Sequence, residues 1–370
     1  MVDKRHVRRD IADVFGTLAE GVRGKRAVQW RLVDRVVAKS RFDDTVTARA
    51  RELAALSDRP AGAAGIALRP LDLAFDEHGA TGSAVSLRIE RATRVAHLTV
   101  TGPAGEQPQT SDAIHAAGDC YWPLRAFREL DAVLLHLRFN EPLVGTVVVR
   151  TLGDGEAVRA IDATLAALAG DWLVREIVLL MKRTLKRMDL TAKSFIALIE
   201  PGSCFAGSLF ELALASDRAY MLDDEARPAT VALSPLNFGP LPMSNGLTRL
   251  ETRFLGDPQL VADLRTEHDP FDPLSAMDAG LVTAAPDEID WDDEVRLAVE
   301  ARAAMSPDAL TGLEANLRFA GPETLETKVF GRLTAWQNWI FQRPNAVGEK
   351  GALRAFGNAS GRAEFDYTRT

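Results

Sequence analysis

FIALIEPGSCFAGSLFELALASDRAYML, residues 195–222, is the stretch that decides the fold. Its first part, residues 195–199, is wholly apolar and ends at a Pro-Gly pair, which is typical of a short strand buried on both faces. Small residues at 203–207 predict a turn, strong helix formers at 209–214 predict a buried helix, and 218–222 predict a second strand. This order leaves unpaired backbone N–H groups at the helix start, where developing negative charge is stabilised. The stretch therefore predicts oxyanion-hole geometry, if a substrate reaches it.

Strand and helix patterns alternate on both sides of this stretch. Residues 85–89 and 95–100 alternate apolar with polar side chains, which is typical of a half-exposed hairpin. Helix followed by buried strand and glycine turn is one α/β repeat, so we expect repeated strand and helix units on one sheet. Further elements are predicted as a helix at 121–139, a strand at 144–149, one long helical region at 157–188, a strand and turn at 229–242, and helices at 291–356.

Composition excludes several classes of protein. The 370 residues are 46% hydrophobic and 26% charged, which is ordinary for a globular chain, and no apolar run is long enough to span a membrane. The charged start MVDKRHVRRD is not a secretory signal, and Cys120 and Cys204 are too few for a disulfide framework or a structural zinc site. A formal net charge of −8 disfavours a nucleic-acid footprint. We expect a cytoplasmic protein with no metal, no membrane and no nucleic-acid partner.

The first 60 residues differ from the rest of the chain in their predicted structure. Residues 2–37 predict two helices around a glycine-containing turn, with an apolar face that nothing before them covers. We interpret residues 1–60 as the terminal helices of a first, truncated unit. The other predicted divisions are a linker at 61–83, a second unit at 84–290 and a helical carboxy-terminal region at 291–370.

The candidate site residues each have a structural interpretation beside the functional one. Glu211 is a candidate acid or base, but Ser208 and Glu211 have capping-box spacing, and capping is the favoured interpretation. Cys204 is favoured as a small buried hydrophobe over a nucleophile, because no histidine is signalled beside it. The basic helix end at residues 182–187 is favoured as a solvated face over a phosphate site. The six histidines show no ligand spacing.

The order of these motifs resembles the crotonase superfamily of enoyl-CoA hydratases and isomerases. The resemblance rests on the hairpin, VVVRT at 147–151, the stretch at 195–222, LSPLNFGPLP at 233–242 and the later Ala-Gly-Leu-Val. Within that superfamily, AAMSPDALTGLEANLRFAGPET at 303–324 and FGRLTAWQNWIFQRPNAVGEKGAL at 330–353 are similar to the benzoyl-CoA-dihydrodiol lyase family, whose members contain two crotonase units. The fold class implied is α/β, with crotonase-like repeated ββα units and a helical carboxy-terminal region.

The resemblance also implies a chemistry. In that family an epoxide or dihydrodiol of benzoyl-CoA is opened with water to formate and a semialdehyde CoA thioester, without any cofactor besides the CoA of the substrate. Backbone N–H groups hold the thioester oxygen, here at Gly207 and Ser208 with Cys204 beside them, and Glu211 matches the first crotonase glutamate. The family's catalytic glutamates lie in the amino-terminal unit.

Departures from the pattern leave alternatives open. The partner of Glu211 falls at Pro235, which cannot ionise. We therefore expect a chain that needs a separately encoded amino-terminal half or a homo-oligomer for the lyase reaction. The alternatives are a non-catalytic CoA-binding or assembly module of crotonase fold and, with Pro235 against it, an enoyl-CoA hydratase or isomerase.

Overall fold

The computed structural model describes residues 1–58, 62, 64–357 and 361–368. The chain separates into two units, Met1–Gly65 and Ile66–Thr370. The predicted subdivisions at residues 84 and 290 stay predictions.

The first unit is a set of short helices with very little core. Only Val7 and Ala27 are buried hydrophobic residues among its described positions, while Val14 and Leu18 are 43% and 38% exposed. Its elements are α1 (Val2–Arg5), α2 (Arg9–Gly16), α3 (Gly24–Gln29), η1 (Lys39–Arg41) and α4 (Phe42–Ala55).

The second unit is built on a seven-stranded sheet in the order β1-β2-β3-β4-β5-β6-β7. The first three pairings are antiparallel and the last three are parallel, so Phe195 lies opposite Val147 and Leu198 opposite Tyr220. The parallel strands are nearly continuous apolar runs because helices must cover both faces. The strands are β1 (Ala74–Asp76), β2 (Gly79–Thr81), β3 (Val85–Glu90), β4 (Val95–Thr101), β5 (Thr146–Leu152), β6 (Ser194–Ile199) and β7 (Arg218–Met221).

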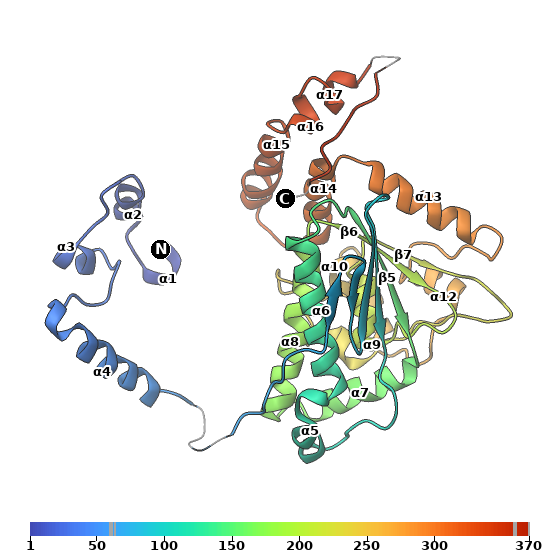
Figure 1. The fold of residues 1–370 in the computed structure, drawn as a ribbon, viewed down its shortest axis with the longest axis horizontal. Coiled ribbons are helices and arrows are strands. Elements are labelled where there is room, and N and C mark those ends of the chain that lie inside the picture. The colour runs from blue at the N-terminus through green and yellow to red at the C-terminus, as the bar shows by residue number, and fades with distance from the viewer. Residues whose placement is uncertain (59–61, 63, 358–360, 369–370) are drawn as a thin grey trace. The chain divides into compact units, whose positions relative to one another are not determined.

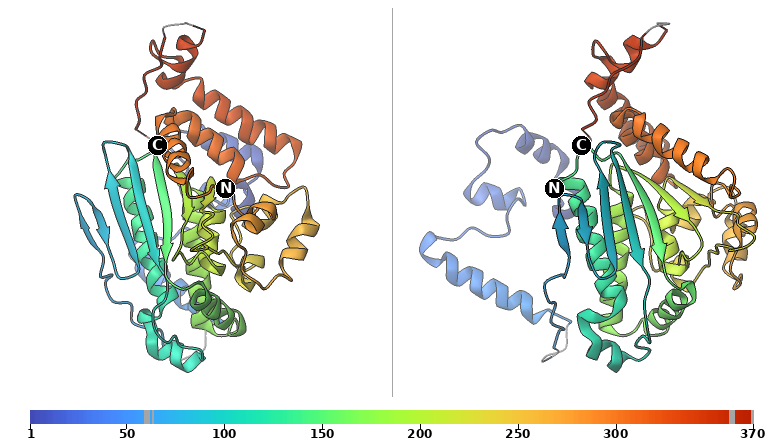
Figure 2. Two further views of the ribbon diagram at one scale, coloured as in Figure 1. Left: turned by 90° about the vertical axis from the view of Figure 1, so that its right-hand side faces the viewer. Right: turned by 45° about the vertical axis from the view of Figure 1, so that its right-hand side comes forward.

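Helices pack on the two faces of this sheet (Figures 1 and 2). The larger core lies between the sheet and α6 (Trp122–Phe139), α7 (Gly155–Ala167), α8 (Trp172–Asp189) and α9 (Gly207–Leu214). A smaller core on the other face joins Val148, Ile196 and Leu198 to Trp291 of α13 (Trp291–Ala304). The remaining elements are α5 (Ser111–Ala117), η2 (Gly118–Cys120), η3 (Pro235–Phe238), α10 (Arg249–Arg253), α11 (Pro258–Leu264), α12 (Pro273–Asp278), α14 (Pro307–Arg318), η4 (Thr327–Leu333), α15 (Thr334–Ile340), α16 (Pro344–Val347) and α17 (Ala352–Ala355).

Two predictions about elements are wrong, and one is made more precise. The expected linker at 61–83 carries β1 and β2, which pair with each other and extend the sheet. The helical region expected at 157–188 consists of two helices, α7 and α8, and Asp171 caps the start of α8 through the backbone N–H groups of Leu173 and Val174. Residues 229–242 make only isolated bridges and the short helix η3, since Ser234 and Asn237 cap that helix.

Candidate functional site

The turn between β6 and α9 is held too tightly for any residue but glycine at position 207. Gly207 has a φ of +46°, and a Cβ there would lie 2.0 Å from Asp162 Oδ2 and 2.7 Å from Ser234 Oγ. Both the backbone conformation and the space therefore require glycine.

The first backbone N–H groups of α9 are already occupied. Gly207 N–H donates to the carbonyl of Ala232 at 2.8 Å, and Ser208 N–H donates to Asp162 Oδ2 at 2.6 Å. Asp162 comes from α7, and Ser234 Oγ donates to the same carboxylate oxygen at 2.7 Å. A carboxylate at a helix start is stabilised by the dipole and by the free N–H groups. The protein thus places one of its own carboxyl groups where the sequence predicts oxyanion-hole geometry.

Asp162 is fully buried, and this changes its titration. Burial raises the pKa of Asp162 to about 7, although hydrogen bonds from Ser208 and Ser234 oppose the shift. Its second oxygen, Oδ1, has no hydrogen-bond partner in the part of the chain that the structure describes. The carboxyl group therefore binds a proton near neutral pH.

Glu211, one turn further along α9, has partners on both carboxylate oxygens. Asn237 Nδ2 donates to Oε1 at 2.7 Å, and Arg249 Nη1 donates to Oε2 at 2.8 Å. Arg249 also donates to both oxygens of Asp189, at 2.6 Å and 3.2 Å. The side chains of Glu211, Arg249 and Asp189 are each exposed by 2% or less. Burial raises the pKa of Glu211 against the opposing effect of Arg249.

The capping interpretation of Glu211 is wrong. The N-cap residue of α9 is Ala206, which makes no side-chain cap, so the predicted capping box does not form. A capping box does form nearby at η3, where Ser234 and Asn237 exchange hydrogen bonds.

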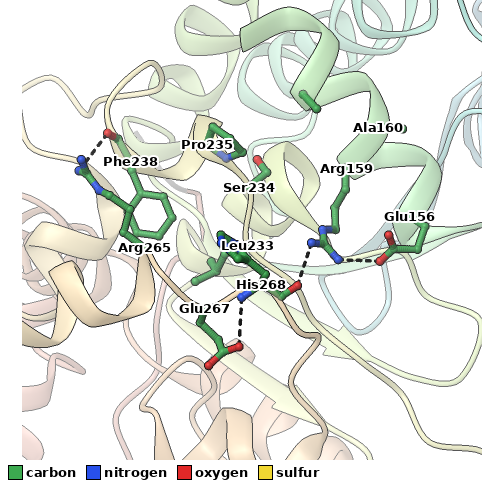
Figure 3. Close-up of a pocket in the computed structure, with 11 residues that line it drawn as sticks. Glu156, Arg159, Ala160, Leu233, Ser234, Pro235, Phe238, Arg265, Glu267 and His268 are labelled. Carbon is green, nitrogen blue, oxygen red and sulfur yellow. Dashed lines mark hydrogen bonds and ion pairs between the residues drawn. The ribbon is translucent and has the colours of Figure 1, made fainter. Parts of the chain in front are cut away.

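A cavity of about 490 Å³ lies on the outer side of this turn (Figure 3). Ser234 and Pro235 line it, and Phe238 and Arg265 lie on one side. Arg159 closes another side, where it pairs with Glu156 and donates to the carbonyl of His268. Gly207, Ser208, Cys204 and Glu211 are not among the described residues that line it. The cavity therefore reaches Pro235, where the crotonase resemblance leads us to expect a second carboxylate, but it does not reach Glu211.

Cys204 lies within the same turn and is 1% exposed. Its backbone N–H donates to Thr151 Oγ1, and its Sγ packs against Gly102 and Gly153. Burial raises the pKa of the thiol. This is the environment of an inert core cysteine.

The structure adds Asp162, Asn237, Arg249 and Asp189 to the residues that the sequence singles out. For Asp162 a signal existed, because it stands one residue after Ile161 and four after Val158 on the buried face of a helix. A lone carboxylate on an apolar face needs a partner. The other three carry no comparable signal.

The described residues contain neither a metal-binding cluster nor a membrane-spanning helix. No group of three histidine, cysteine, aspartate or glutamate residues there is placed to hold a metal ion. None of the described helices has the length and apolar character needed to cross a membrane.

Comparison with known proteins identifies the class of fold first. AtuE of Pseudomonas aeruginosa aligns with a TM-score of 0.50 and 17% identity over 74% of this chain and 96% of that chain. An enoyl-CoA hydratase of Bacillus anthracis aligns with a TM-score of 0.50 and 16% identity over 71% and 93% of the two chains. No family model matches the sequence. The fold is therefore the crotonase fold of these enoyl-CoA hydratase neighbours, as the sequence motifs predict.

Comparison of the sequence with known proteins then identifies a particular relative. The chain is 52% identical to a benzoyl-CoA-dihydrodiol lyase of Aromatoleum evansii over all 370 residues. It spans 66% of the length of that relative. The resemblance recognised in the sequence is confirmed.

Proposed function

We propose that this chain acts in the benzoyl-CoA-dihydrodiol lyase reaction, in which the ring of a 2,3-epoxide or dihydrodiol of benzoyl-CoA is cleaved to a semialdehyde CoA thioester and formate. The observation that carries the proposal is the 52% identity to a relative of that name along the whole chain. The substrate is then a CoA thioester, no further cofactor takes part, and the reaction belongs to cytoplasmic benzoate degradation. A homo-oligomer or a separately encoded amino-terminal half completes the enzyme.

Within this proposal, Glu211 is a structural anchor and the proton transfers belong to other residues. A general acid or base must reach the proton that it moves. Glu211 is 1% exposed and both of its oxygens are paired with Asn237 and Arg249. The N–H groups of Gly207 and Ser208 have partners within the protein, which supports a positioning role for this turn.

The test measures formate release from the dihydrodiol of benzoyl-CoA by two proteins. One is the 370-residue chain, and the other is this chain joined to the third of the Aromatoleum relative that it does not span. We expect turnover from the joined protein and little or none from the chain by itself. Absence of formate from both folded proteins would overturn the proposal.

A second candidate function is a non-catalytic CoA-binding or assembly module. The occupied start of α9 favours it, because Asp162 fills the place where a thioester oxygen would be held. Calorimetry with benzoyl-CoA separates the two functions when it is combined with the formate assay. Binding without turnover in the joined protein selects the module.

A hydratase or isomerase is the weakest alternative, since Pro235 stands where its second carboxylate is needed. An assay of crotonyl-CoA hydration tests this directly, with the loss of the enoyl absorbance as the readout. We expect no hydration.

A further inference from the structure

A second cavity, of about 390 Å³, lies at the opposite end of α9, and five arginines are among the residues that line it. The end of α9 contributes Leu214 and Ala215, and Asp189 and Asp217 supply the carboxylates of the lining. Five arginines come from four elements: Arg218 from β7, Arg249 and Arg253 from α10, Arg302 from α13 and Arg318 from α14. Arg249 and Asp189 also belong to the buried cluster around Glu211, whereas Arg218, Arg253, Arg302 and Arg318 make no bond to Glu211 among the described residues.

Two of these arginines are held by carboxylates. Arg249 binds Asp189 and Glu211, as described above. Arg318 Nη2 lies 2.7 Å from Asp217 Oδ2 and also donates to the carbonyl of Lys193. Although burial opposes it, the charge of Asp217 keeps the pKa of Arg318 above its ordinary value. The two aspartates of the lining are thus committed to fixed partners.

The other three arginines are less completely matched. Arg302 Nη2 is 3.9 Å from Asp217 and 3.7 Å from Glu314, and its nearest partner is the neutral hydroxyl of Ser194, at 3.0 Å. Arg218 contacts the hydroxyl of Tyr220 at 3.4 Å, and Arg253 donates to the carbonyl of Gly280. Neither Arg218 nor Arg253 pairs with a carboxylate in the described part of the chain.

Guanidinium groups without carboxylate partners around one cavity fit one class of ligand. Arginine presents a planar fork of donors that matches the oxygens of phosphate and carboxylate groups. The five guanidinium groups face four carboxylates, those of Asp189, Glu211, Asp217 and Glu314, so the cluster keeps an excess of positive charge. We propose that this cavity binds a phosphate or pyrophosphate group of a small-molecule ligand, with Arg218 and Arg253 as its main contacts.

The carbonyl end of α9 points toward the same region and disfavours an anion. Its partial charge is about half an elementary charge and falls off within one turn. The excess of guanidinium charge is larger than this partial charge and lies on the cavity lining itself. The net effect on an anionic ligand is therefore attraction.

The experiment is calorimetric titration of the 370-residue chain with inorganic phosphate, inorganic pyrophosphate and adenosine 3′,5′-bisphosphate. Tighter binding of the bisphosphate than of pyrophosphate identifies a nucleotide as the source of the phosphate; the reverse order identifies a free phosphate. Arg218→Ala and Arg253→Ala are each expected to weaken binding about tenfold, since a hydrogen bond between charged groups contributes that much.

Arg296→Ala is the matched control. It removes one positive charge from α13 at a residue that pairs with Asp293 and Glu300 and lies outside this cavity's lining. Arg218→Lys keeps the charge and loses the fork, and should recover only part of the affinity. Thermal melting shows that each variant is folded. The proposal is overturned if none of the three ligands binds, or if Arg296→Ala weakens binding as much as Arg218→Ala.

Discussion

The two ends of α9 differ in how completely their polar groups are matched. At its start, Asp162 and the carbonyl of Ala232 accept from the N–H groups of Ser208 and Gly207, and neither Ser208 nor Gly207 is among the described residues that line the 490 Å³ cavity. At its end, Arg218 and Arg253 line an open cavity without carboxylate partners among the described residues. A crotonase-type site is expected at the start of this helix, yet the groups free to bind a ligand lie at its other end.

Removal of Arg249 should have the largest effect, because this side chain links Glu211 to Asp189 in the closed region. Arg249→Met leaves two buried carboxylates without their cation, and we expect a loss of about 3–5 kcal/mol in the free energy of unfolding. Urea unfolding measures it. Arg296→Met, at an exposed arginine with two acidic neighbours, is the control and should cost under about 1 kcal/mol. Equal losses in the two variants would contradict the anchoring role of Arg249.

Gly207→Ala should have the second-largest effect on the free energy of unfolding. The new Cβ meets Asp162 and Ser234, and the φ of +46° is strained for alanine. Gly105→Ala is matched in conformation, with a φ of +68°, and has nothing within 4 Å. We expect Gly207→Ala to be less stable than Gly105→Ala by about 2 kcal/mol, the cost of overpacking. If both variants lose the same stability in urea, the close approach of Asp162 is not real.

The sequence predicts the strands and helix around Gly207 to within about two residues, because their apolar runs are continuous and buried. It misses β1 and β2, which are three residues each and become strands only by pairing with the hairpin. It also assigns Glu211 a cap that does not form, since its partners Asn237 and Arg249 lie 26 and 38 residues away. Tertiary contacts at that range leave no local pattern to read.

Asp162, at the start of α9, should make the free energy of unfolding depend on pH. Its pKa is about 7 when folded and about 4 when unfolded, so the folded state binds more protons between these values. The free energy of unfolding should therefore fall as pH rises through this window, by up to about 1.4 kcal/mol per pH unit. Asp162→Asn keeps an acceptor for Ser208 and Ser234 and removes this contribution. The difference in the free energy of unfolding between the two proteins, measured in urea from pH 4 to pH 8, isolates the contribution of Asp162. If the two proteins lose stability in parallel as the pH rises, Asp162 does not bind a proton in the folded state.

The smallest effect is expected at the cysteines. Cys204, in the turn between β6 and α9, is 1% exposed, and burial raises the pKa of its thiol. Cys120, by contrast, is exposed. Iodoacetamide followed by mass spectrometry should label Cys120 and leave Cys204 unmodified in the folded protein. Equal labelling would show that the turn opens.

The central claim is that Glu211 anchors a closed helix start and transfers no proton. The direct test is turnover of benzoyl-CoA dihydrodiol by Glu211→Gln, in the chain joined to the rest of the Aromatoleum relative's length, at a temperature where circular dichroism shows it folded. The account predicts a kcat within about twofold of the parent protein. A loss of about a hundredfold or more, the contribution of a general acid or base, would contradict it.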